Sequence, residues 1–231
     1  MKLLKLCCIA FLLISMFLGC NNPAQTTANV PRIRAVVESL GNGSVQFTAH
    51  AEGPDGNALT GAAVLVRDAA NQITMLHFDS ETFSYIGTGG ETTGETNYSF
   101  EVSSVLSNEP VTLSVPYTPV LIKPAVTIFR DAVGSSVLAG QVLSRSSDIQ
   151  IAWNSCGNEI TYLIQVKTAL QTVYAVSTNA LTITIPKDTI PAGFYSLEIM
   201  AQKIYGDPTF RDNPYYSISA LQGSGLSFNA E

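Results

Sequence analysis

Apolar and polar residues alternate one by one in short segments along most of this chain, and this two-residue period limits its fold more than any other feature. In Ser44–Glu52, for example, Val45, Phe47 and Ala49 are separated by polar residues. Successive side chains of a strand point to opposite faces of a sheet, so this pattern predicts half-buried β-strands. No long stretch shows the 3.6-residue period of an amphipathic helix, and we therefore expect few helices.

The first half of the chain shows seven such short segments, separated by turn residues such as those after Glu52. Seven short strands at this spacing are typical of a β-sandwich. The Gly-rich segment Gly87–Glu95 lacks the lysine of a phosphate-binding loop and is expected to be a flexible loop. Pro116 and Pro119 cannot donate to a sheet ladder, so we place a domain boundary between residues 118 and 119. The link is short, and the domains should lie end to end with limited freedom.

Alternation continues in the second half through Ile149–Trp153 and Ile160–Val166. Trp153, Tyr162 and the segment around Ile190, Pro191 and Tyr195 resemble the pattern of a fibronectin type III domain. The resemblance implies a buried Trp153 and a corner closed by the Tyr195 hydroxyl on the upstream backbone. The C-terminal segment 223–228 is expected to add an edge strand or to fray.

The run from Asp55 to Val64 resembles a strand-turn of bacterial immunoglobulin-like and carboxypeptidase-regulatory-like domains. Together, the alternation and the two resemblances predict an all-β protein. We expect an immunoglobulin-like β-sandwich over residues 31–118 and a fibronectin type III-like β-sandwich over residues 119–231, in tandem.

The N-terminal segment has the composition of an export signal. Lys2 and Lys5 precede the apolar run Leu6–Leu18. A bilayer-spanning helix needs ~20 apolar residues, so the run is too short to cross a membrane stably. Residues 1–19 are therefore interpreted as a signal peptide and left out of the fold.

The signal ends in the sequence Phe17-Leu18-Gly19-Cys20, which resembles the lipobox of bacterial lipoprotein precursors. The resemblance implies that Cys20 is diacylated with palmitate-like chains and becomes the mature N-terminus. Two or more chains would anchor the protein stably to a membrane. Residues 20–30 are polar and are expected to form the tether. An ordinary signal peptide with an incidental cysteine remains the alternative.

Charge is distributed unevenly and argues against nucleic acid as a partner. Between Cys20 and Thr118 the chain has ten acidic residues and only three basic ones, Arg32, Arg34 and Arg67. Proteins that bind nucleic acids derive much of their affinity from neutralising phosphates with basic residues. A chain without a basic stripe is poorly suited to that task.

Candidate residues for catalysis are few. His50 and His77 both lie on the polar phase of their predicted strands. No serine lies in a G-x-S-x-G nucleophile elbow, and no cluster of cysteines and histidines has the spacing of a zinc site, so we expect no catalytic residue, no metal site and no cofactor. Cys156 is expected to be a buried apolar residue, and a reactive thiol is the alternative.

The sequence thus predicts a non-catalytic binding or adhesion module in the bacterial cell envelope. We expect the protein at the outer membrane or cell surface more than at the inner membrane, and the partner would be an envelope or host protein or a glycan. A structural spacer or an accessory subunit of an envelope assembly is the alternative. Aromatic residues near predicted loops and strand ends offer a modest hint of a binding surface, although most should pack in the cores; they are Phe83, Tyr85, Tyr205, Phe210, Tyr215 and Tyr216.

Overall fold

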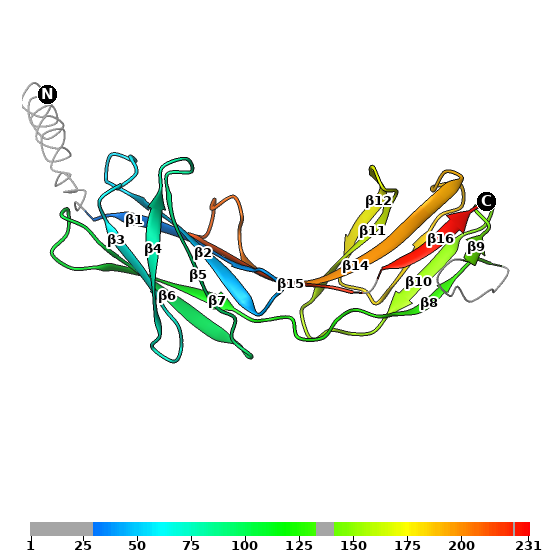
Figure 1. The fold of residues 1–231 in the computed structure, drawn as a ribbon, viewed down its shortest axis with the longest axis horizontal. Helices are drawn as coiled ribbons and strands as arrows, with labels where there is room; N and C mark the ends of the chain where they lie inside the picture. Colours follow the sequence, from blue (N-terminus) through cyan, green and yellow to red (C-terminus); the bar gives the residue numbers. More distant parts are fainter. Residues whose placement is uncertain (1–29, 133–140, 224) are drawn as a thin grey trace, which may run out of the picture.

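The computed structural model describes residues 30–132, 141–223 and 225–231, and these residues form an all-β protein. They contain no helix, which confirms the fold class predicted from the alternation. The signal peptide, Cys20 and most of the tether lie outside the described residues. Figure 1 shows two lobes joined by a narrow waist, with the first half of the chain in one lobe and most of the second half in the other.

The first lobe is a two-layered sandwich of seven strands. In hydrogen-bonding order, β1, β2, β5 and β4 form one layer and β3, β6 and β7 form the other, and β4 pairs with both β5 and β3. The strands are β1 (Arg32–Ser39), β2 (Ser44–Glu52), β3 (Ala63–Arg67), β4 (Ile73–Asp79), β5 (Ser84–Gly90), β6 (Thr96–Ser103) and β7 (Val111–Tyr117).

The core of the first lobe follows directly from the two-residue period. On β2, every second side chain is buried, and Phe47 packs edge-on against Tyr98 and Phe100 of β6. Burial of this face supplies most of the driving force for folding, because apolar area leaves water when the layers meet.

The second lobe is also a sandwich. The strands β12, β11, β14 and β15 form one layer, with β16 and β9 extending it beside β14, and β13, β10 and β8 form the other layer. The strands are β8 (Val126–Arg130), β9 (Gln141–Leu143), β10 (Ile149–Trp153), β11 (Thr161–Lys167), β12 (Thr172–Thr178), β13 (Thr182–Ile185), β14 (Gly193–Gly206), β15 (Tyr215–Gln222) and β16 (Leu226–Ala230).

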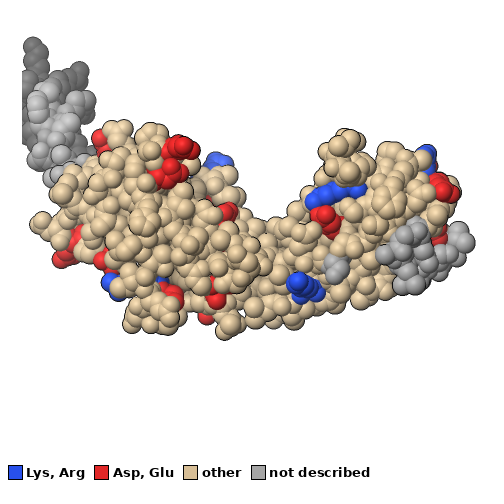
Figure 2. Space-filling model, in the orientation of Figure 1, with Lys and Arg blue, Asp and Glu red and all other residues tan. Residues whose placement is uncertain are grey.

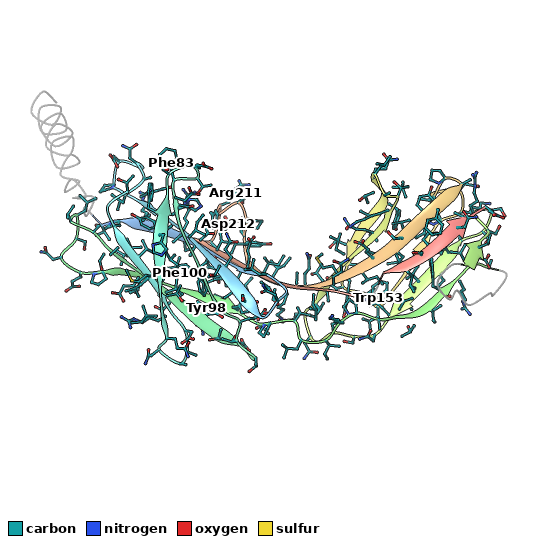
Figure 3. The ribbon with its side chains drawn as sticks, viewed as in Figure 1. Phe83, Tyr98, Phe100, Trp153, Arg211 and Asp212 are labelled. Atoms are coloured by element: carbon teal, nitrogen blue, oxygen red, sulfur yellow. The ribbon has the colours of Figure 1, made fainter. Side chains whose placement is uncertain are left out.

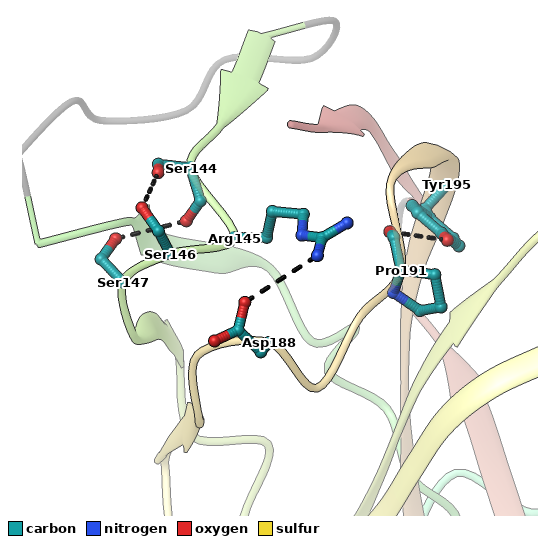
Figure 4. A network of polar contacts seen from close by, with 7 residues as sticks. All are labelled: Ser144, Arg145, Ser146, Ser147, Asp188, Pro191 and Tyr195. Carbon is teal, nitrogen blue, oxygen red and sulfur yellow. Dashed lines mark hydrogen bonds and ion pairs between the residues drawn. The ribbon is translucent and has the colours of Figure 1, made fainter.

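The residues on which the fibronectin resemblance rests occupy the expected places. Trp153 is buried and lies against Tyr162, with ring centroids 5.4 Å apart. The Tyr195 hydroxyl donates a hydrogen bond of 2.9 Å to the carbonyl of Pro191, four residues upstream (Figure 4). Close by, Arg145 and Asp188 form an exposed ion pair of 3.9 Å, which contributes little to stability.

The waist contains a feature that the sequence did not reveal. The ends of β14 and β15 leave the second core and reach the first lobe, where β15 pairs in parallel with β1 from Ala35 opposite Tyr215 to Glu38 opposite Ile218. The two lobes therefore share one sheet of thirteen strands. Buried residues from Ile33 to Tyr117 form one core and those from Val120 to Ala230 form another. The domain boundary at residues 118 and 119 stays a prediction.

The linker is held against this shared sheet by buried hydroxyl groups. Ser219 Oγ accepts a hydrogen bond of 2.7 Å from the Val120 amide, and Ser217 Oγ donates one of 2.5 Å to the Pro116 carbonyl. The Thr118 and Tyr205 hydroxyls are 2.9 Å apart. Together with the parallel pairing, these bonds fix the angle between the lobes.

Two local expectations need correction. The segment Gly87–Glu95 is not wholly a loop, because Gly87–Gly90 belong to β5. A Cβ at Gly87 would lie 2.6 Å from the Leu76 side chain, and one at Gly89 would lie 2.7 Å from the Phe47 side chain. The absence of a side chain at these two glycines therefore lets Leu76 and Phe47 pack closely against the β5 backbone. The C-terminal segment adds a strand, β16, which is not an edge strand because β14 and β9 flank it.

Candidate functional site

The face of the shared sheet that lies opposite the linker forms a hollow between the lobes, which Figure 2 shows as the notch in the upper outline. Ser217 and Ser219 of β15 point to the linker, so the alternate side chains Tyr216 and Ile218 point into the hollow. The hollow is thus built from both halves of the chain.

Apolar side chains cross the floor of this hollow from lobe to lobe. Leu163 stands opposite Met200, Ile204 opposite Ile218, and Val36 opposite Tyr216 in the sheet register. Ile204 is 40% exposed and the other five are partly exposed. We call these six residues the saddle surface: Val36, Leu163, Met200, Ile204, Tyr216 and Ile218.

Charged groups border the saddle surface. On the second lobe, Lys167 and Glu198 form an ion pair of 2.6 Å. On the first lobe, the charged group is Glu38. Burial and the charge of Glu38 raise the pKa of Tyr216, so the Tyr216 hydroxyl stays protonated at neutral pH. An apolar floor with a charged rim is the usual composition of a protein-binding surface.

The opposite side of the waist carries a groove of about 750 Å³ between the linker and the loop before β11. Lys203 is buried there, with its ammonium group 2.5 Å from the Glu159 carboxylate and 3.3 Å from the Asn158 carbonyl. This pairing lowers the pKa of Glu159, so the carboxylate is ionised at neutral pH. The buried ammonium group is therefore neutralised within the protein, and its bonds fix the loop against β14.

Cys156 also borders this groove but is buried, with its amide donating to the Tyr162 hydroxyl over 2.9 Å. Burial raises the pKa of the thiol, so it stays protonated at neutral pH. A protonated, buried thiol is a poor nucleophile. The structure therefore favours the apolar interpretation of Cys156 over the reactive one.

The two histidines lie apart from each other on the first lobe. His50 is partly buried on β2, where burial and the neighbouring Arg34 lower its pKa, so it is neutral at neutral pH. His77 is exposed on β4, opposite Ile86. In the described part of the chain, no three side chains of the metal-ligating types lie close enough to hold a metal ion. Those same residues include no helix long and apolar enough to cross a bilayer.

The aromatic candidates separate into core and surface residues. Tyr85 is 3% exposed, and its hydroxyl accepts from the Ala62 amide and donates to the Leu59 carbonyl, so it belongs to the first core. Phe83 is 61% exposed at the turn before β5 (Figure 3). The remaining four lie on the waist or its hairpin loop and are partly exposed. They are Tyr205, Phe210, Tyr215 and Tyr216. Aromatic residues near predicted strand ends thus indicated, from the sequence alone, part of the surface at the waist.

Comparison with known proteins gives distant likenesses to solved structures. No protein-family model matches this chain, and no curated protein matches it. A cytokine receptor complex is similar at 10% identity and a TM-score of 0.39, covering 84% of this chain and 94% of that chain. The fibronectin(III)-like modules of CbhA from Clostridium thermocellum reach 12% identity and a TM-score of 0.38, covering 87% and 93%. The Yersinia pseudotuberculosis adhesin InvE reaches 13% and 0.26, covering 86% and 60%. At such TM-scores these likenesses carry no argument about function.

Proposed function

We propose that this protein is a non-catalytic binding or adhesion module, tethered to a bacterial envelope membrane by acyl chains on Cys20. One observation carries the proposal: the saddle surface is built from strands of both halves on a single sheet. A surface fixed in shape before binding loses less conformational entropy when a partner docks. Its partner would be an envelope or host protein or a glycan, and no enzymatic step is assigned to it.

The same rigidity favours a second function, a structural spacer or accessory subunit of an envelope assembly. Parallel pairing of β15 with β1 prevents free hinge motion between the lobes. A spacer needs a fixed length, which the shared sheet would supply. The two functions differ in how many partners contact the saddle surface, and crosslinking distinguishes them.

For this test, a photo-crosslinking amino acid replaces Ile204 on the saddle surface of the protein in its own cells. The matched control carries it at Ile73, which is 52% exposed on β4, away from the waist. We expect crosslinked species from position 204 and none of those species from position 73. One constant envelope protein would favour the accessory subunit, whereas partners that change with added host material would favour the adhesion module. No crosslink specific to position 204 would contradict both functions.

The anchor is tested separately by Cys20→Ser. Serine lacks the thiol to which the lipid group would be attached, so the variant should leave the membrane fraction and lose labelling by a fatty-acid analogue. The wild-type chain serves as the control, and surface proteolysis of intact cells reports which face carries the protein. Membrane association that persists in the variant would reject the lipid anchor while leaving the crosslinking result intact.

A further inference from the structure

A second cavity, of about 520 Å³, lies where the loop between β14 and β15 meets the first lobe. Residues 207–214 form this loop and bring Phe210, Arg211 and Asp212 to the edge of β1 and β2. Figure 3 shows Arg211 and Asp212 on the loop that rises beside the hollow. Arg32, Arg34 and Glu52 supply the wall from the first lobe. The cavity therefore exists only because the second half of the chain reaches the first.

Positive charge is concentrated in this cavity. Two of the three arginines between Cys20 and Thr118 line it, and Arg211 joins them from the other half. Three arginines and the two acidic residues Glu52 and Asp212 line the cavity, which leaves a net charge of +1 (3 − 2). Outside the cavity, the segment from Cys20 to Thr118 carries one arginine and nine acidic residues, because Glu52 is the one acidic residue of that segment that lines the cavity. His50, which pairs with Arg34 in the register, is neutral and adds no charge.

One of the three guanidinium groups is held in place, and two are available. Arg34 pairs with Glu52, and its guanidinium carbon lies 5.7 Å from the centre of the Phe210 ring. Arg32 and Arg211 are exposed, and among the described residues neither has an ion-pair partner. A cavity that gathers guanidinium groups without satisfying them is suited to an anionic ligand.

The loop is also held in a costly backbone conformation. Phe210 has a φ of 54°, in the left-handed region that is unfavourable for a residue other than glycine. A hydrogen bond of 3.0 Å from its amide to the Asp207 carbonyl fixes this turn. The turn places the Phe210 ring against Arg34.

We propose that this cavity binds a phosphate group, as a ligand additional to the partner proposed for the saddle surface. A phosphate offers three or more oxygens and can accept from several guanidinium forks at once, whereas a single fork already satisfies both oxygens of a carboxylate. A phospholipid headgroup and a soluble phosphate ester both present this chemistry. The inference goes beyond the proposed function, because no residue of the saddle surface lines the cavity. The crosslinking at Ile204, Cys20→Ser and the experiment below can therefore fail independently.

The experiment is calorimetric titration of the purified full-length chain, in detergent and at low ionic strength. The probes are inorganic phosphate, glycerol phosphate and dihexanoyl phosphatidylglycerol, with dihexanoyl phosphatidylcholine as the zwitterionic comparison. The variants are Arg211→Gln and Arg32→Gln. The matched control is Arg67→Gln, which removes the same charge from an arginine that pairs with Glu101 at 3.6 Å on the other layer, outside the cavity.

We expect saturable phosphate binding that weakens about tenfold in each cavity variant, because each substitution removes charge-assisted hydrogen bonds to the phosphate. Arg67→Gln should bind as the wild type does. Saturable binding of phosphatidylglycerol without phosphatidylcholine would identify a lipid headgroup as the source, and binding of only the soluble esters would identify a soluble ligand. The absence of saturable phosphate binding, or equal weakening by Arg67→Gln, would overturn the proposal.

Discussion

Replacing Trp153 by alanine is expected to lower the free energy of unfolding by about 3–5 kcal/mol, which is the range for removing a buried aromatic side chain. The indole is 3% exposed in the second core and contacts the ring of Tyr162. Removal leaves a cavity that the surrounding strands cannot fill, because β10 is fixed between β8 and β13. Urea denaturation followed by circular dichroism measures the change.

Trp153→Phe is the matched control for this prediction. The indole Nε1 is buried and has no hydrogen-bond partner among the described residues, so phenylalanine removes a polar group that gains nothing from burial. The loss should therefore be well below that of Trp153→Ala. A midpoint for the alanine variant close to that of the wild type would show that Trp153 is not a core residue.

Gly206→Ala is expected to destabilise the protein by more than about 2 kcal/mol and to loosen the waist. Gly206 ends β14 with a φ of 79°, and a Cβ there would lie 2.1 Å from the Tyr215 carbonyl oxygen. The hairpin that carries β15 onto β1 cannot keep its geometry with a side chain at this position. Hydrogen exchange should therefore be faster for the amides of Tyr215 to Ile218, which pair with β1.

The control for the waist is Gly94→Ala. Gly94 has no neighbouring atom within 4 Å of its Cβ position and does not have a positive φ. The same substitution there should change stability by less than about 0.5 kcal/mol, as is usual for surface sites. Unchanged exchange at Tyr215 to Ile218 in Gly206→Ala would show that the parallel pairing does not depend on this turn.

The positions of the strands were predictable because apolar and polar residues alternate within each strand. The alternation around Val45 and Phe47 requires one buried face wherever the strand lies, and the structure buries that face. The role of Tyr195 was expected from the resemblance to fibronectin type III domains, and it is a local one, since the hydroxyl bonds a carbonyl only four residues away. Gly87 and Gly89 were not, because their role depends on Leu76 and Phe47 side chains from other strands.

The amino-acid sequence by itself determined the all-β class, the burial of alternate side chains and the tyrosine corner, because these depend on local periodicity and on contacts a few residues apart. Only the tertiary structure decided the parallel pairing of β15 with β1, the saddle surface and the arginine cavity. Each joins segments from opposite ends of the chain. No local pattern records which sheet edge remains free to accept another strand, so the packing of the complete molecule decides that pairing.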